Sequence, residues 1–320
     1  MLRKTLAAMA AATMLFSVPI GALAESYPDK PIKVIVPNGA GGSTDITSRL
    51  VAKEFSAKLG QNLAIVNMGG GGTAIGAMEA AKSTPDGYTL LSTHEAFLTS
   101  SALGVNTLGP KSVKPIAQVA KEVIVLTVPK GSAITSLADF YDASTKGHSD
   151  ANLNLGVSPG AANHFFFLSV LSPIDHDVTF IPTGGGAKTL KALLGGTIDA
   201  GVFAVSESIQ AIRSGDIVPI ALFDKNRHAD LPDTRTASEQ GHDVSVGLHY
   251  VWYAPAETPD DRVATLASVL TEVISDEAFR NTLVERSITP ELITGSDLTA
   301  ALDARFTETK ALAEKYVVGN

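Results

Sequence analysis

The chain has 320 residues, a formal net charge of −8, no cysteine and an apolar fraction of 45%. This length and apolar fraction predict a folded protein of about two domains and exclude a disordered chain or a coiled coil. The acidic balance argues against a nucleic-acid partner, because the phosphates of nucleic acids select a basic surface.

The first 24 residues differ in character from the rest of the chain. Arg3 and Lys4 precede an apolar stretch, and Ala22-Leu23-Ala24 has small residues at the positions typical of a cleavage site. Polar and helix-breaking residues interrupt the apolar stretch, which disfavours an N-terminal membrane anchor. We therefore predict a signal peptide at residues 1–24 that is cleaved after Ala24 and exports the protein to the periplasm.

Short apolar strands alternate with glycine-rich turns and helices in the next part of the chain. The expected elements are a strand at 31–37, a helix at 46–59, a strand at 63–66, a helix at 73–82 and a strand at 88–92, with glycine-rich turns at 38–45 and 69–72. An order of strand, glycine loop, helix and strand is typical of a parallel α/β sheet.

The same pattern restarts in the middle of the chain. Strands are expected at 124–128, 151–157, 178–181, 198–203 and 218–222, and helices at 136–145, around Phe165 to Leu171, and at 187–194. The rest is expected to be helical at 260–275, 276–286 and 296–316. Extended segments near 120–126 and 245–255 connect the two α/β blocks and predict a hinge rather than a flexible linker.

Three glycine-rich loops and the turn at Ser158 lead into helices in both blocks. Exposed N–H groups and the helix dipole make such positions suitable for anions, and open α/β sheets bind ligands at the carboxyl ends of their strands. Glycine can also serve only to allow a tight turn. No charged residue and no Walker lysine occurs at 37–44, 69–73, 158–163 or 183–187. We therefore expect a small anion held by N–H groups, hydroxyls and water rather than a nucleotide.

Neither a cofactor nor a metal ion is expected. The seven histidines form no H-x-x-x-H pair, and the chain has no cysteine ligand. His94 and Glu95 end an expected strand at the binding edge, so both are candidates to orient a ligand. Glu95 would disfavour a second carboxylate in the ligand by like-charge repulsion, or could pair with a ligand amine.

An enzymatic alternative rests on Gly156-Val157-Ser158-Pro159-Gly160. This segment matches the G-x-S-x-G elbow that carries the nucleophilic serine of α/β hydrolases. The elbow needs a backbone N–H directly after the serine, and Pro159 has none. We therefore expect no catalytic residue, and an exported serine hydrolase using Ser158 remains the alternative.

Several further motifs occur in a fixed order along the chain. They are Tyr27-Pro-Asp-Lys-Pro-Ile-Lys-Val-Ile-Val-Pro37, Ala40-Gly-Gly-x-x-Asp45, Leu59-Gly-Gln61, Asn67, the glycine run to Gly76, Pro85-Asp-Gly-Tyr-Thr-Leu-Leu91, His164, the 182–186 loop, Leu193-Leu-Gly-Gly-x-Ile-Asp199, Leu231-Pro-Asp233 and Ala254-Pro-Ala256 with Thr258-Pro259. In this order and spacing the sequence resembles the substrate-binding proteins of tripartite tricarboxylate transporters, also called Bug receptors.

The resemblance implies an α/β, two-lobed periplasmic binding protein of type II-like architecture. Each lobe would hold a mixed, mostly parallel sheet flanked by helices, with two hinge crossings. We place one lobe at 25–123 plus 250–320 and the other at 124–249. The implied protein is a monomer that captures a small organic carboxylate and delivers it to the membrane permease subunits of the transporter, and a receptor for a two-component sensor is a further alternative.

The resemblance also implies which residues bind the carboxylate. Asn38, Ala40, Gly41 and Ser43 would act from one lobe, and Ser158, Asn163, Thr183 and Gly184 from the other. In that family both lobes bind one ligand carboxylate through backbone groups and ordered waters, so closure of the lobes would accompany binding.

Overall fold

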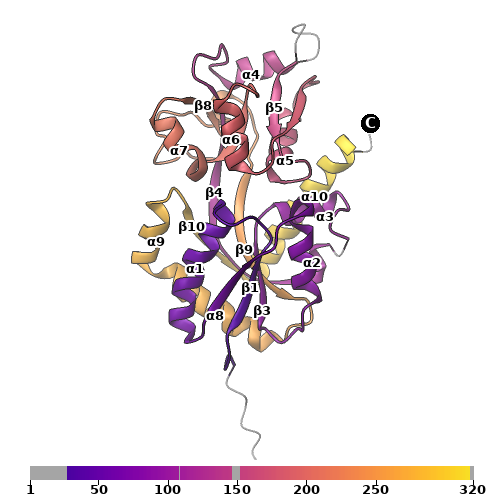
Figure 1. Ribbon diagram of the computed structural model, residues 1–320, viewed down its shortest axis with the longest axis vertical. Coiled ribbons are helices and arrows are strands. Elements are labelled where there is room, and N and C mark those ends of the chain that lie inside the picture. The colour runs from indigo at the N-terminus through magenta and orange to yellow at the C-terminus, as the bar shows by residue number, and fades with distance from the viewer. Residues whose placement is uncertain (1–26, 108, 146–151, 318–320) are drawn as a thin grey trace, which may run out of the picture.

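The computed structural model describes residues 27–107, 109–145 and 152–317. Two α/β lobes lie one above the other and are joined by two long strands, β4 (Val113–Pro129) and β9 (Gly247–Pro255) (Figure 1). This is the two-lobed architecture that the sequence predicts. The predicted signal peptide lies outside the described residues. Within the described ranges, no helix combines the length and the apolar character that crossing a bilayer would require.

The lower lobe is built on a sheet with the strand order β10-β4-β9-β3-β1-β2. Strand β1 pairs in parallel with β2 and β3, and its residues Ile32, Val34 and Ile35 are fully buried, as expected where helices cover both faces of a sheet. The further elements of this lobe are β1 (Ile32–Val36), α1 (Ser43–Leu59), β2 (Leu63–Asn67), α2 (Ala74–Lys82), β3 (Thr89–Thr93), α3 (Ala96–Ala102), α8 (Asp260–Ser275), α9 (Glu277–Val284), β10 (Thr289–Thr294) and α10 (Gly295–Val317).

The upper lobe surrounds the second half of β4. There β4 pairs antiparallel with β7 and β8, while β5 and β6 pair in parallel and reach β7 through a bridge between Leu155 and Ala200. The elements of this lobe are α4 (Leu137–Ser144), β5 (Asn154–Val157), α5 (Ala162–Leu171), β6 (Thr179–Pro182), α6 (Gly186–Leu194), β7 (Gly201–Ala204), α7 (Val205–Arg213) and β8 (Ile217–Leu222).

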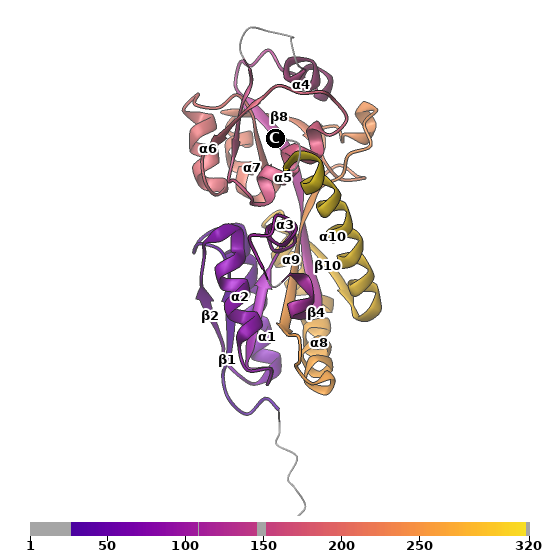
Figure 2. The ribbon, with the colours of Figure 1, turned by 90° about the vertical axis from the view of Figure 1, so that its right-hand side faces the viewer.

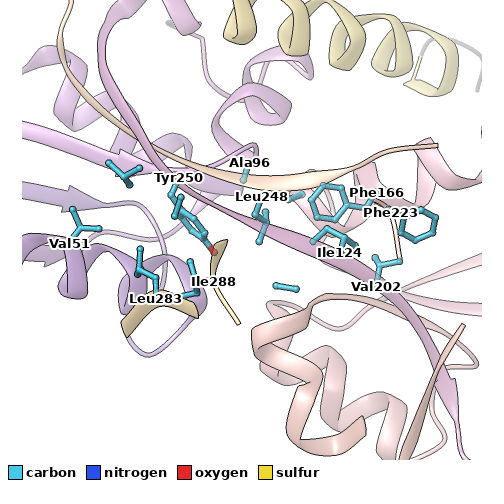
Figure 3. Packing of buried hydrophobic residues seen from close by; sticks show 14 of the residues in the cluster. Val51, Ala96, Ile124, Phe166, Val202, Phe223, Leu248, Tyr250, Leu283 and Ile288 are labelled. Carbon is cyan, nitrogen blue, oxygen red and sulfur yellow. The ribbon is translucent and has the colours of Figure 1, made fainter. Parts of the chain in front are cut away.

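The two crossing strands connect the lobes through one continuous core. β4 pairs with β9 as far as Val123 and with β7 and β8 from Ile124 onward. A single hydrophobic cluster follows the strands across this point, from Tyr250 on the lower side to Ile124 and Phe223 on the upper side (Figure 3). The change of partner falls at the predicted boundary between residues 123 and 124, and the domain limits themselves stay a prediction.

Some elements were not expected from the sequence. The expected strand at 124–128 is the end of the 17-residue β4, and α3, α7 and β10 were not predicted. Both α3 and α7 follow a strand without a glycine turn, so the glycine signal that indicated the start of other helices is missing there. The crossing strands add antiparallel pairing at the centre of the sheet, beside the parallel strands β1, β2 and β3.

Helix α10 runs beside both lobes (Figure 2). It packs against α3 of the lower lobe and α5 of the upper lobe, and Nζ of Lys315 donates to the carbonyl oxygen of Ser172 at 3.1 Å. The C-terminal helix therefore links the lobes at a place separate from the two crossing strands.

Candidate functional site

A cavity of about 1290 Å³ lies between the two lobes. The lower lobe contributes the loops at 37–42 and 69–72 and the first residues of α1. The upper lobe contributes Ser158, the start of α5 and the starts of α6 and α7. The loops that follow β1, β2, β5, β6 and β7 thus meet at one place, which is where open α/β sheets bind ligands.

The loop after β1 is fixed by one buried aspartate, Asp45. Its carboxylate accepts the backbone N–H of Gly41 at 2.9 Å, the Nε–H of Arg49 at 2.9 Å and the side-chain N–H of Asn67 at 2.9 Å. Asn67 also donates to the carbonyl oxygen of Asn38 at 3.2 Å. These bonds fix the loop in one conformation.

The electrostatics of Asp45 match this role. Burial raises the pKa of the carboxyl, but the hydrogen bonds from Arg49, Gly41 and Asn67 outweigh it, so the pKa of Asp45 is below its ordinary value. The carboxylate stays charged and bonded. Since the N–H of Gly41 is already used, the expected backbone donors for an anion must come from the neighbours of Gly41.

The opposite loop, 158–163, is held in a similar way. Asn163 accepts the backbone N–H of Ser158 at 3.0 Å through Oδ1, and His164 accepts the N–H of Gly160 at 3.3 Å through Nδ1. The hydroxyl of Thr99 in the lower lobe donates to the carbonyl oxygen of Gly160 at 3.3 Å. The loop therefore also touches the other lobe, beside Gly72.

The structure brings most of the predicted site residues together at the cavity. Seven of the ten line it, namely Asn38, Ala40, Gly41, Ser43, His94, Ser158 and Asn163. Glu95, Thr183 and Gly184 are not part of the lining. The binding role of all ten stays a prediction, which the position of the first seven supports and that of the last three does not.

The three residues outside the lining are each engaged elsewhere. Glu95 accepts the backbone N–H and the ring Nδ1–H of His249, and Arg305 lies 3.8 Å from its carboxylate. The N–H groups of Thr183 and Gly184 both point to the carbonyl oxygen of Val157, at 2.8 and 3.4 Å. The expectation that Glu95 repels a ligand carboxylate or pairs with a ligand amine stays a prediction, and these contacts do not support it, because the charge of Glu95 already has His249 and Arg305 as neighbours.

His94 lines the cavity as a neutral ring. Burial lowers the pKa of its imidazole, although the charge of Glu95 acts in the opposite direction. Its Nδ1 accepts the N–H of Ala96 at 3.2 Å, so the neutral tautomer carries its proton on Nε2. The ring packs edge-on against Tyr250, with centroids 6.1 Å apart. His94 thus caps the start of α3 by accepting the N–H of Ala96, and its own Nε2–H remains as a donor.

Two glutamates in the cavity wall were missed by the sequence analysis. Glu122 comes from β4 and Glu207 from the first turn of α7, and both line the cavity, although they lie outside the loops that were expected to be free of charge. Glu122 accepts hydroxyl hydrogen bonds from Ser206 and Tyr250, and burial raises its pKa to about 7. Glu207 follows β7 at its carboxyl end, so the rule that pointed to the glycine loops would also have pointed to it.

Basic side chains lie at the exposed margin of the same cavity. Lys188, Lys191, Arg213 and Arg286 are exposed, and Arg213 forms an ion pair with Asp230 at 2.6 Å. Such charges are screened by solvent and salt more strongly than the two glutamates. In the described part of the chain, no cluster of three or more His, Asp or Glu residues is arranged to hold a metal ion.

The model of the family described as "Tripartite tricarboxylate transporter family receptor" matches residues 47–316. The chain belongs to this family. Protein BugT of Bordetella pertussis is 29% identical over 294 residues, which cover 88% of this chain and 87% of BugT. Of the solved structures, the periplasmic binding protein BugD is 26% identical with a TM-score of 0.80, over 90% of this chain and 98% of that one.

A second solved relative was determined with a ligand. MatC from Rhodopseudomonas palustris, with bound malate, is 25% identical with a TM-score of 0.79, over 90% of this chain and 100% of MatC. Members of this family are solute-binding receptors that serve transporters, and they are not enzymes. The family therefore favours the non-enzymatic prediction over the Ser158 hydrolase.

Proposed function

We propose that this receptor captures a small organic carboxylate between its lobes in the periplasm and delivers it to the permease of a tripartite tricarboxylate transporter. The observation that carries the proposal is the cavity between the lobes, at which uncharged loops and helix starts of both lobes meet. Malate in the related MatC supports the carboxylate class.

The geometry explains how such a ligand would be held. Helices α1, α5 and α6 all begin at the cavity, and the N–H groups of a first helical turn have no partner inside the helix. The hydroxyl of Ser158 adds a donor from the upper lobe. Because the donors are divided between the lobes, the ligand binds the closed arrangement more tightly and shifts the population toward it.

Thermal-shift and calorimetric screens of mono-, di- and tricarboxylates test this proposal. A carboxylate that binds only the folded state raises the melting temperature, and at a given concentration a tighter ligand raises it more. We expect Ser158→Ala to weaken binding several-fold, because one donor is lost. Ser172→Ala is the matched control, since the hydroxyl of this serine, directly after α5, donates to the carbonyl oxygen of Ser169 and Ser172 lies outside the cavity lining. The proposal fails if no carboxylate binds, or if the bound acid is chemically altered.

Delivery to the permease needs a separate measurement. Membrane vesicles that contain the permease subunits should accumulate the labelled carboxylate only when the receptor is added. Uptake that does not depend on the receptor, together with normal binding, would favour the sensor alternative over transport.

A further inference from the structure

The carboxylate of Glu207 lies between the starts of two helices that belong to different lobes. A Cβ placed on Gly186, the first residue of α6, would lie 2.3 Å from Oε2 and 2.8 Å from Oε1 of Glu207. On the other side lies Ser43, the first residue of α1: burial raises the pKa of the Glu207 carboxyl, and the hydroxyl and backbone N–H of Ser43 act to lower it. Glu207 thus occupies a position that suits an anion.

Glu122 is a second, buried carboxyl at this end of the cavity. It is 1% exposed, lines the cavity and accepts hydroxyl groups from Ser206, next to Glu207 in the chain, and from Tyr250. The charge of Glu207 raises the pKa of Glu122, in addition to the larger effect of burial. Among the described residues, neither carboxylate forms an ion pair with a lysine or arginine, in contrast to Glu95.

This arrangement treats two kinds of ligand end group differently. A second carboxylate placed near Glu207 would meet an unpaired like charge in a partly desolvated site and compete for the same N–H groups. An ammonium group would instead pair with the carboxylate of Glu207, which forms no ion pair with a lysine or arginine among the described residues. The repulsion contributes to selectivity as much as the attraction does.

We propose that Glu207, supported by Glu122, makes this receptor select an amino carboxylate over a dicarboxylate of the same length. The ligand carboxylate lies on the uncharged loops of the two lobes, and the ligand ammonium faces Glu207. This inference rests on the proposed function and names the substrate class of that same site.

The test uses sets of acids that differ only at the end far from the carboxylate. Butyrate, 4-aminobutyrate and succinate end in a methyl, an ammonium and a second carboxylate, and their homologues with one and two more methylenes form two further sets. Calorimetry on the wild-type receptor should rank the amino acid first and the dicarboxylate last. In Glu207→Gln this preference should fall by about tenfold or more. Glu257→Gln removes the same charge at an exposed residue outside the cavity lining and should leave the ranking unchanged.

A second variant keeps the charge and moves it. In Gly186→Ala the new Cβ forces the flexible end of Glu207 away from the helix starts, whereas Gly185→Ala has nothing within 4 Å of its Cβ. We expect Gly186→Ala to reduce the preference for the amino acid and Gly185→Ala to preserve it. Melting temperatures near the wild-type value show that each variant is folded.

The outcomes separate this inference from the function on which it rests. If dicarboxylates bind the wild-type receptor at least as well as their amino counterparts, or if Glu207→Gln leaves the ranking intact, the inference is overturned and the carboxylate receptor stands. If no acid of any set or of the wider screen binds, the proposed function fails, and the inference fails with it.

Discussion

The two walls of the cavity are built from similar elements and differ in charge. The lower wall consists of glycine-rich loops and the start of α1, with Glu285 and Arg286 only at its exposed margin, and the buried Asp45 points into the loop and is fully bonded. The upper wall carries Glu207 from α7 and lysines from α6. Glu122 lies where the two walls meet, on the crossing strand β4.

This difference suggests a division of roles. A fixed, uncharged wall can hold any carboxylate, because backbone N–H groups recognise the charge and not the rest of the molecule. A wall with charges that belong to separate side chains can distinguish one end group from another. We therefore expect the lower wall to set affinity and the upper wall to set selectivity.

The largest effect is expected from Asp45→Ala in the lower wall. The substitution leaves the N–H of Gly41 and the Asn67 amide without their shared acceptor and releases the first loop. We expect the free energy of unfolding to fall by about 3 kcal/mol. Carboxylate affinity should fall for all acids alike. Denaturant unfolding and calorimetry measure the two effects.

Asp260→Ala is the matched control for Asp45. This aspartate also forms an ion pair, with Lys114 at 2.9 Å, but its side chain is 96% exposed. Exposed ion pairs add little to stability, so the control should behave as the wild type. A loss of stability in Asp45→Ala no greater than in the control would contradict the fixed lower wall.

A smaller effect is expected from Glu122→Gln, at the junction of the walls. The pKa of this carboxyl is raised to about 7 in the folded state, so between pH 4.5 and 7 the folded protein holds a proton that the unfolded chain has lost. Stability from this group is complete below pH 4.5 and is lost as the pH rises toward 7, a change of about 3 kcal/mol. Gln cannot titrate and should remove this loss.

The measurement for Glu122 is a difference between two pH profiles. The histidines with lowered pKa, such as His94 and His164, stabilise the fold as the pH rises and are common to both proteins. The melting temperature of Glu122→Gln minus that of the wild type should therefore increase from pH 5 to pH 8. A difference in melting temperature that stays constant from pH 5 to pH 8 would show that Glu122 does not titrate in this range.

The smallest effect is expected from Gly72→Ala, where the lower wall touches the upper one. Gly72 has φ +57°, and a Cβ there would lie 3.2 Å from the carbonyl oxygen of Gly160 in the opposite loop. We expect a loss of about 1 kcal/mol in stability from the left-handed backbone and several-fold weaker binding from hindered closure. Gly104→Ala, at φ +71° with nothing within 4 Å, should show the loss in stability alone.

Most of the local structure could be predicted from the sequence, and its failures have a common cause. Periodicity and glycine turns located helix α1 and strand β1 within a few residues. They did not reveal α7, which begins directly after β7 with Val205-Ser206-Glu207 and lacks a preceding glycine. For the site, the glycine loops could be predicted because a turn and an anion site share one local signal.

The roles of single charged residues could not be predicted in the same way. Glu95 was expected to face the ligand because it ends a strand, yet it pairs with His249, 154 positions later in the chain. The role of Glu207 could not be predicted because Ser43 lies in the other lobe, and Gly186, although in the same lobe, is brought near it only by the folding of that lobe.

By itself, the sequence determined the alternation of strands and helices, the uncharged loops at the ends of the strands and the family resemblance. These depend on neighbours within a few residues, whose periodicity and turn chemistry are local. Only the tertiary structure decided which carboxylates are neutralised, such as Glu95 and Asp45, and which face the cavity unpaired, such as Glu207. The reason is physical: the state of a charge depends on its desolvation and on the partners that surround it in space.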